Sequence, residues 1–294
     1  MNEPQLSVVV ASVNGFPYVG RCLDSLRRHA PGAEVIVAAS ADAELERQIG
    51  ERWPEVRLVT VGEPMGVPKL RAAGIVAASA PYVAVTEDHC VVHAGWADRI
   101  VAAHREGHAV VGGPIRNGAD KRIRDWAAFF CEYSEFMKPV GTGVAASLPG
   151  MNVSYDRRAI EAMAPLLDWG CFETWIHPHL QKSGFELYSD DAITLDHVMD
   201  FDVGVFLPQR YHYARSYAGM RNADLGPKRF LYMLGSPVLV PLAFYRIARN
   251  VLRRRARARL AMASPLVLLY TAAWTFGEAV GYGLGGGRSL LRVR

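Results

Sequence analysis

Strands and helices alternate through the first 112 residues, and this alternation restricts the fold more than any other feature of the sequence. Short apolar runs indicate strands, and the amphipathic or small-residue segments between them indicate helices. Strands are predicted at residues 6–11, 35–38, 56–61, 82–85 and 109–112, and helices at 18–29, 41–50, 67–78 and 93–105. This order is typical of an α/β fold with a mostly parallel sheet and right-handed crossovers.

The pattern changes after Gly113. The elements predicted there are an aromatic helix at 123–137, a Gly/Pro-containing loop at 138–150, a strand at 151–155, a helix that starts at the cap Asp156 and reaches Met163, a helix at 172–183 and an extended segment at 185–195. His104 and His108 flank the end of the helix at 93–105 and are expected on the surface. His177 and His179 lie two positions apart, so they point to different helix faces and form a poor metal pair.

The charge distribution divides the chain into an acidic body and a basic tail. The formal net charge is +4, but residues 228–294 hold twelve Lys or Arg and one acid, whereas residues 1–227 hold 21 bases and 28 acids. We therefore predict a globular domain at 1–226 and an apolar, basic helical region at 227–294. The acidic body argues against nucleic-acid binding, because phosphate backbones require clustered cations.

Composition and cysteine spacing indicate a globular chain in a reducing compartment. Half of the residues are hydrophobic and 21% are charged, which is typical of a folded rather than a disordered protein. The cysteines Cys22, Cys90, Cys131 and Cys171 are scattered without CxxC spacing, so a cytosolic setting is the simplest expectation. The segment before the first strand is short and polar, so no signal peptide is expected.

The segment from Pro81 to Cys90 carries the strongest indication of chemistry. Its buried strand ends in Glu87, Asp88 and His89, three side chains that can bind a metal. Charges at the end of a buried strand must be paired, hydrated or metal-bound, and open α/β sheets bind ligands at the carboxyl ends of strands. Oxygen ligands with one imidazole suit Mg²⁺ or Mn²⁺. The alternative is a turn in which Asp88 caps the helix at 93–105.

Several short motifs occur together in a specific order. They are Ala11-Ser-Val-Asn14 after the first strand, Gly66-Val-Pro-Lys-Leu-Arg71, Glu87-Asp-His89 followed by Gly95-Trp96, Gly150-Met-Asn-Val-Ser154, Cys171-Phe-Glu-Thr-Trp175, and a later strand that ends in His197. In this order and spacing, the chain resembles a family 2 glycosyltransferase with the GT-A fold of nucleotide-diphospho-sugar transferases, over roughly residues 5–220. Residues 1–226 are then expected to form the catalytic domain.

The resemblance implies a site for a nucleotide-sugar donor, a divalent metal (Mn²⁺ or Mg²⁺) and an acceptor. The implied residues are Glu173 as catalytic base; Ser12, Asn14, Asp42, Lys69, Arg71, Glu87, Asp88, Arg210 and Arg215 for the donor; Asn152 and Trp175 for the acceptor; and Asp88, His89 and His197 for the metal. Segment 209–217 resembles the family's mobile segment that closes over the diphosphate, and its alternative is a solvated amphipathic loop.

Donor recognition departs from the family pattern. Ala39 and Ser40 stand where the family often carries paired acids that read the nucleotide base, and Asp42 lies further on. The sequence therefore leaves the base of the donor open. The metal motif also has Glu87 and His89 where aspartates are commoner, and imidazole tolerates softer metals better than a carboxylate does.

The tail contains two apolar segments, at 230–248 and 260–284, with an arginine-rich run between them. Each approaches the ~20 residues needed to cross a bilayer. If both crossed, the arginines would lie outside, against the positive-inside rule. We therefore expect segments that lie in or re-enter the cytosolic face of the cell membrane, with arginines on anionic lipids. The alternative is a helical hairpin that packs on the globular domain or joins a homo-oligomer.

The sequence thus predicts a membrane-associated, metal-dependent, inverting glycosyltransferase. The acceptor is expected to be a glycan or a polyprenyl-linked lipid. A phosphate acceptor would already be ionised and would reduce Glu173 to a positioning role. The alternative from another functional class is a membrane-anchored scaffold that binds sugar nucleotides without turnover.

Overall fold

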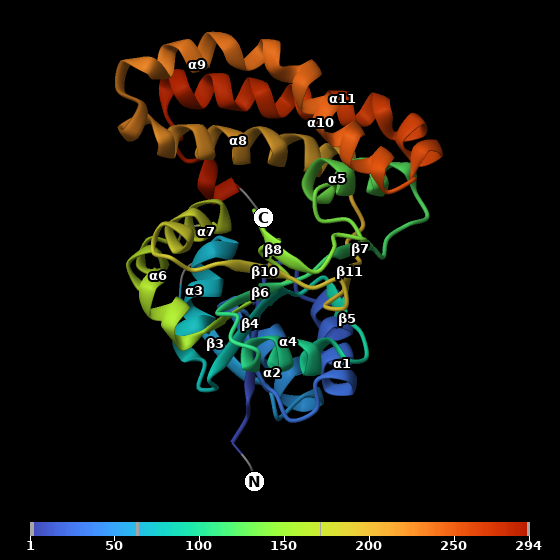
Figure 1. The fold of residues 1–294 in the computed structure, drawn as a ribbon, viewed down its shortest axis with the longest axis vertical. Coiled ribbons are helices and arrows are strands. Elements are labelled where there is room, and N and C mark those ends of the chain that lie inside the picture. Colours follow the sequence, from blue (N-terminus) through green and yellow to red (C-terminus); the bar gives the residue numbers. More distant parts are fainter. Residues whose placement is uncertain (1–2, 63–64, 171, 293–294) are drawn as a thin grey trace. The chain divides into compact units, whose positions relative to one another are not determined.

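The computed structural model describes residues 3–62, 65–170 and 172–292 and divides into two compact units (Figure 1). The first unit contains the chain up to Gly118 together with Phe136–Val198, and the second contains Ala119–Glu135 and the chain from Met199 onward. Cys171 lies outside the described residues. This division differs from the predicted boundary at residue 226, because the helix before that boundary packs within the second unit. A boundary of the functional domain at 226 stays a prediction.

The larger sheet of the first unit has eight strands in the order β3-β2-β1-β4-β9-β6-β10-β8. Its strands are β1 (Leu6–Ser12), β2 (Glu34–Ser40), β3 (Arg57–Val61), β4 (Tyr82–Glu87), β6 (Val110–Gly112), β8 (Gly143–Ala145), β9 (Val153–Asp156) and β10 (Leu187–Ser189). The first four strands are parallel, and β9 runs antiparallel between β4 and β6. The prediction of a mostly parallel sheet is confirmed. A second sheet contains β5 (Cys90–Val92), β11 (Leu195–His197) and β7 (Ile115–Asn117).

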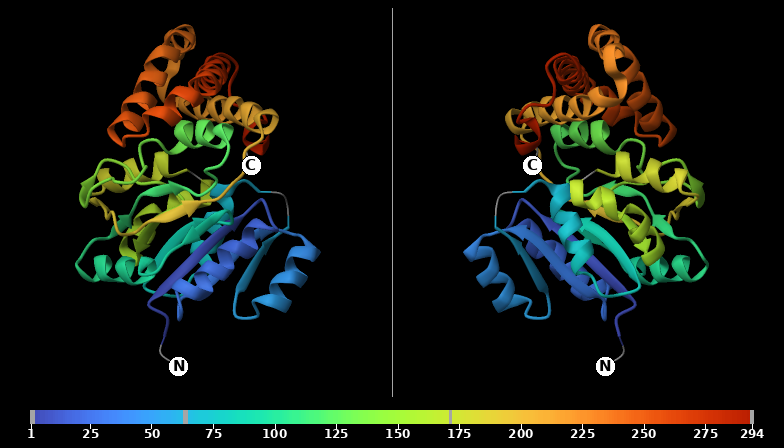
Figure 2. Two further views of the ribbon diagram at one scale, coloured as in Figure 1. Left: turned by 90° about the vertical axis from the view of Figure 1, so that its right-hand side faces the viewer. Right: turned by 90° about the vertical axis from the view of Figure 1, so that its left-hand side faces the viewer.

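Helices flank the strands of this unit, as the side views of Figure 2 show. They are α1 (Tyr18–His29), α2 (Ala43–Arg52), α3 (Val67–Ala77), α4 (Trp96–Arg105), α6 (Arg157–Trp169) and α7 (Glu173–Lys182). Asp156 caps α6 through the amide of Ala159, as predicted. Helix α4 begins later than predicted because the residues before it form β5. Its N-cap is Gly95, so Asp88 does not cap this helix.

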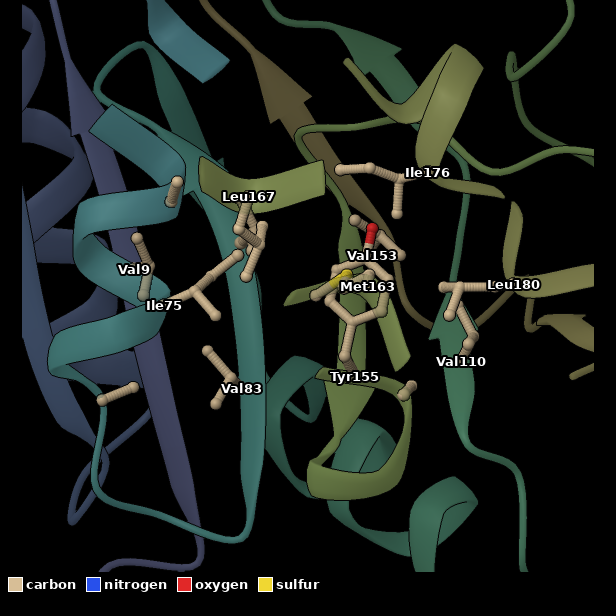
Figure 3. Close-up of a cluster of buried hydrophobic side chains, with 14 of the residues drawn as sticks. Val9, Ile75, Val83, Val110, Val153, Tyr155, Met163, Leu167, Ile176 and Leu180 are labelled. Carbon is tan, nitrogen blue, oxygen red and sulfur yellow. The ribbon is translucent and has the colours of Figure 1, made fainter. Parts of the chain in front are cut away.

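The core of the first unit lies between the larger sheet and helices α3, α6 and α7 (Figure 3). Strand residues Val83 and Val153 meet Met163 of α6 and Leu180 of α7, and each of these side chains is at least 98% buried. Apolar side chains removed from water contribute roughly 25 cal/mol per Å². Gly74 lets helix α3 approach β1 closely, because a Cβ atom at this position would overlap the side chain of Val9.

The second unit is helical. It contains α5 (Ile123–Tyr133), α8 (Val203–Leu225), α9 (Arg229–Gly235), α10 (Val240–Arg253) and α11 (Arg257–Leu284). Helices α8 and α11 run side by side in Figures 1 and 2. Gly277 and Gly281 allow this approach, because a Cβ atom at either position would overlap the backbone carbonyl of Tyr211 or Arg215. Segment 209–217 therefore lies inside a packed helix, so the alternative of a solvated loop is wrong. Its role as a segment that closes over the diphosphate stays a prediction.

Two helical stretches of the second unit are long and apolar enough to cross a membrane, Gly226–Arg253 and Arg257–Leu284. Only 11% of the most apolar window of the first stretch is buried, against 39% for the second. Length and composition alone support this statement, and the core helix of a soluble protein can meet the same criteria.

His104 is buried, contrary to the expectation that it lies on the surface. Its Nδ1 lies 2.7 Å from the carbonyl oxygen of His108, and its Nε2 lies 2.9 Å from Oγ of Ser154. Its ring stacks on Tyr82 with centroids 4.5 Å apart. Burial disfavours the imidazolium and lowers the pKa of His104 to about 4.

We therefore expect a loss of stability below neutral pH that depends on His104. Between pH 6.5 and 4 the unfolded chain binds a proton at this side chain and the folded chain does not, so stability falls with falling pH. The contribution is on the order of 2 kcal/mol at pH 5 relative to pH 7. Urea unfolding of the wild type and His104→Asn at both pH values measures it. Identical pH dependence in the two proteins would contradict this assignment.

Candidate active site

A buried carboxylate joins the carboxyl ends of β1 and β4. Asp88 follows β4 and is fully buried. Its Oδ2 accepts hydrogen bonds from the backbone amides of Val13 at 2.9 Å, Asn14 at 2.7 Å and Gly15 at 3.2 Å. The hydroxyl of Ser12 donates to the same oxygen at 3.0 Å. Gly15 has a φ of +63°, a left-handed conformation that glycine adopts without strain.

The second oxygen of Asp88 is also engaged. Its Oδ1 accepts a hydrogen bond from the side-chain amide of Asn14 at 2.8 Å and lies 3.0 Å from Nδ1 of His89. Predicted donor residues Ser12, Asn14 and Asp88 therefore come together. Both carboxylate oxygens face donors of the protein itself, and the role of Asp88 as a metal ligand stays a prediction.

Glu87, His89 and His197 lie together at the same strand end, and all three are buried. Nε2 of His89 lies 3.1 Å from Oε2 of Glu87, and the rings of His89 and His197 meet edge to face with centroids 4.5 Å apart. Burial opposes the charge on His89, but hydrogen bonds to Asp88 and Glu87 and their negative charges raise its pKa to about 10. Burial and the neighbouring charge of His89 hold the pKa of His197 well below its usual value.

Arg71 of α3 connects this strand end to the first residue of α7. One guanidinium nitrogen, Nη1, donates to Glu173, and the other, Nη2, donates to Glu87. The three side chains are 8%, 15% and 11% exposed in the order Arg71, Glu173, Glu87. Burial alone would raise the pKa of Glu87, but the charge of Arg71 and a hydrogen bond from His89 lower it to about 2. The carboxylate of Glu87 is thus held ionised in the interior.

Gly150 belongs to the site, and the sequence indicated it only as part of the motif Gly150-Met-Asn-Val-Ser154. A Cβ atom at this position would overlap the carboxylate of Glu173 and Nη1 of Arg71. The glycine therefore allows the Arg71–Glu173 ion pair to lie against the backbone. Only the motif itself signalled this position.

A buried polar pair near Glu173 was not predicted from the sequence. Oη of Tyr155 lies 3.1 Å from Nε2 of His177, one helical turn after Glu173 in α7. Burial lowers the pKa of His177 to about 4 and raises that of Tyr155. His179 instead lies 3.0 Å from the carbonyl oxygen of Ala162, so the two histidines do face different ways, as predicted.

Asn152 occupies the interior rather than an acceptor-facing surface. It is fully buried, and its amide nitrogen donates to the carbonyl oxygens of Pro114 at 3.0 Å and Ile193 at 2.7 Å. Its Oδ1 accepts a hydrogen bond from the indole of Trp96 at 2.9 Å. These contacts give Asn152 a structural role, and its predicted contact with the acceptor stays a prediction.

The remaining predicted residues of the first unit lie at helix starts. Asp42 is exposed and caps α2, where its Oδ1 accepts from the amides of Glu44 and Leu45. Lys69 is exposed in the first turn of α3, and Trp175 is half-buried in the first turn of α7. Their proposed contacts with donor and acceptor stay predictions.

Arg210 and Arg215 belong to α8 of the second unit. The guanidinium of Arg210 lies 4.2 Å from the ring centroid of Trp274 and 3.8 Å from Glu132. Nε of Arg215 donates to the carbonyl oxygen of Gly285 at 3.1 Å. Both arginines thus pack within their own helical unit, and their contact with a donor stays a prediction.

The chemistry of the donor groups fits a divalent metal ion. Glu87 offers a carboxylate, and His89 and His197 offer imidazole nitrogens in adjacent positions, a set that suits Mn²⁺. Within the part of the chain that the structure describes, no three histidine, cysteine, aspartate or glutamate side chains are arranged so that they could hold a metal ion. A ligating imidazole must be neutral, so a cation would displace the proton of His89.

Comparison with known proteins decides the family. The model of "Glycosyl transferase family 2" matches residues 7–162. This chain belongs to glycosyl transferase family 2. It is a glycosyltransferase with a GT-A fold, as the sequence predicted. A search of curated proteins found no match.

Three solved glycosyltransferase structures share the fold. The mannosyltransferase PcManGT from Pyrobaculum calidifontis, in complex with GDP-Man and Mn²⁺, has a TM-score of 0.56 at 17% identity over 97% of this chain and 88% of its own. GalNAc-T7 with UDP, GalNAc and Mn²⁺ has a TM-score of 0.53 at 15% identity over 69% and 45%. TarS 1–349 of S. aureus has a TM-score of 0.52 at 13% identity over 95% and 90%. These identities support the fold alone.

Arg71→Met tests the buried ion pairs. Removal of the cation leaves two carboxylates in the interior, so we expect a loss of about 3–5 kcal/mol at pH 7 in urea unfolding. The loss should shrink at pH 5, because burial raises the pKa of Glu87 once its cation is gone. Arg47→Met is the matched control, since Arg47 pairs with Glu44 and Glu51 on the surface and exposed pairs contribute little. Equal losses in the two variants would contradict a buried role for Arg71.

Proposed function

We propose that this protein transfers a sugar from a nucleoside-diphosphate donor to a hydroxyl acceptor, with Glu173 as the general base. The observation that carries the proposal is the Arg71 bridge, which fixes Glu173 beside Glu87 at the strand end that follows the Asn14 turn. A base at the edge of a nucleotide-binding sheet is what such a reaction requires.

Glu173 would remove the proton of the acceptor hydroxyl as its oxygen attacks the anomeric carbon. The bond to the diphosphate breaks on the opposite face, so one displacement inverts the configuration. Arg71 donates a hydrogen bond to Oε1 of Glu173. Oε2 lies beside Gly150, and we assign this oxygen as the acceptor of the proton. Arg71 is engaged by two carboxylates, so its predicted contact with phosphate gives way to the positioning of Glu173.

Glu87, His89 and His197 would hold the divalent cation in this proposal. When bound, the cation offsets the negative charge that grows on the leaving diphosphate. Two imidazoles favour Mn²⁺ over Mg²⁺, because Mg²⁺ prefers oxygen ligands. PcManGT and GalNAc-T7 were solved with Mn²⁺, which agrees with this choice. The donor base stays open, since these two structures contain GDP-Man and UDP respectively.

The second unit supports attachment to the cytosolic face of a membrane. Large apolar side chains of α9 and α10 are exposed, among them Leu231 at 75%, Leu234 at 71% and Tyr245 at 59%. Soluble proteins rarely expose apolar patches on this scale without a partner. Arginines at 246, 249 and 253 are exposed on α10 and would contact anionic headgroups. A glycan linked to a lipid would then present its acceptor hydroxyl at the same membrane.

Glu173→Gln tests the proposed base, because it keeps the side-chain shape and removes the proton acceptor. Turnover of donor and hydroxyl acceptor should fall by ~10²-fold or more, while donor affinity stays within about twofold. Glu161→Gln, an exposed glutamate of α6, is the control and should keep full turnover. Near-normal turnover of Glu173→Gln would exclude this base and favour an acceptor that is already ionised, such as a phosphate. Donor binding by a wild type without any turnover would favour the non-catalytic scaffold.

Charge reversal on α10 tests membrane attachment in the full-length protein. Changing Arg246, Arg249 and Arg253 to Glu should weaken flotation with anionic vesicles by ~10-fold or more, since each basic residue near the surface contributes about 1 kcal/mol. Some binding should survive high salt, because screening does not act on buried apolar area. The control changes Arg21, Arg28 and Arg105 of the first unit, which are also exposed, by the same charge. Equal effects of the two triple variants would contradict an α10 contact with lipid.

A further inference from the structure

Asp88 has no metal or substrate role in the proposal above, although it is the most completely enclosed acid of the site. Both of its oxygens meet donors from the β1 turn, and one of them also meets the neighbouring imidazole. We propose that Asp88 is a positioning residue: its single carboxylate fixes the turn Ser12–Gly15 and sets the ring of His89. The inference rests on the proposed function, because it assigns this turn to the donor and His89 to the metal.

The geometry requires a carboxylate at position 88. Three backbone amides and a hydroxyl converge on Oδ2, and such a cluster of donors matches a negative charge. The amide of Asn14 and Nδ1 of His89 meet Oδ1. Asparagine at this position has one oxygen only. With that oxygen in the turn, its NH₂ group would face the NH₂ of Asn14, and with the reverse orientation it would face the backbone amides.

The contact with His89 determines which ring nitrogen is available to a cation. Nδ1 lies 3.0 Å from Oδ1 of Asp88 and 3.2 Å from the side-chain amide nitrogen of Asn14, and Nε2 lies on the side of Glu87, 3.1 Å from its carboxylate. Histidines that bind metals usually donate their other ring nitrogen to a carboxylate, which fixes the tautomer. Loss of such a partner typically lowers metal affinity by 10- to 100-fold.

Asp88 would thus contribute to nucleotide binding through the β1 turn and to metal binding through His89. The turn of β1 would not hold its shape without a charge beneath it, since Val13, Asn14 and Gly15 direct their amides inward to the same oxygen. A direct metal ligand would affect metal affinity alone. A positioning residue should affect both metal affinity and the affinity of the turn for a nucleotide in the absence of metal.

The test compares full-length wild type with Asp88→Asn in three measurements. We expect Mn²⁺ affinity without nucleotide, measured by calorimetry, to fall 10- to 100-fold. We expect the affinity for GDP and UDP in EDTA to fall at least threefold for whichever nucleotide the wild type binds. In ¹⁵N spectra of the histidine rings, the Nδ1–H signal of His89 should shift, because the carboxylate next to it has been replaced.

Unchanged nucleotide affinity in EDTA together with an unchanged Nδ1–H signal of His89 would overturn the proposal, even if Mn²⁺ affinity falls. Ser12→Ala provides a second variant should Asp88→Asn not fold, since it removes one donor to the carboxylate and leaves the charge. It should weaken binding of GDP or UDP in EDTA and shift the Nδ1–H signal of His89, and no change in either would overturn the proposal. A wild type that binds neither Mn²⁺ nor nucleotide would instead refute the proposed function.

Discussion

The ion pairs of Arg71 with Glu87 and Glu173 are the interaction on which the site depends. A buried guanidinium is stable only if carboxylates surround it, and these two come from a strand and a helix far apart in the sequence. Packing around Gly150 leaves room for the contact. The same cation that neutralises the strand end also holds the proposed base in place. Because the buried charge of Arg71 must be paired, it also fixes the position of Glu173, the proposed base.

The charges of the site are close to balance. Arg71 and a protonated His89 face Glu87, Asp88 and Glu173, which leaves one excess negative charge in this buried cluster. Loss of the His89 proton would leave two, the number that a divalent cation neutralises. The raised pKa of His89 and the proposed metal site thus have one cause, the carboxylates on either side of the ring. Ionisable groups with perturbed pKa values often cluster at functional sites. In this cluster, a bound cation would neutralise the excess negative charge.

Local pattern was sufficient for the sheet but not for the direction of individual side chains. Alternation of apolar runs predicted β1 to β4 and their helices to within a few residues, since periodicity reflects which face is buried. From the sequence, Glu87, Asp88 and His89 were all predicted to bind the donor or the metal. Side chains at the end of a strand alternate between its faces, so Asp88 turns toward β1 while its neighbours face Arg71 and His197.

The contacts of the site span distances that no sequence window contains. Arg71 and Glu173 are 102 positions apart, and the resemblance implied separate roles for them, so their pairing was not predicted. The helical state of segment 209–217 was not predicted either, because it depends on the glycines of α11 that let α8 and α11 pack closely. Tyr155 and His177 left no signal, since a buried aromatic strand residue and a helical histidine are ordinary core residues.

In the proposed reaction, this site uses a divalent cation to release a nucleoside diphosphate from a sugar donor. Incubation of the purified full-length protein with a panel of GDP-, UDP- and dTDP-sugars, first with Mn²⁺ and then with EDTA, measures this release. We expect release from at least one donor with Mn²⁺ present and its disappearance when EDTA is added. Release that persists at the same rate in EDTA, or no metal-dependent release from any donor, would contradict it.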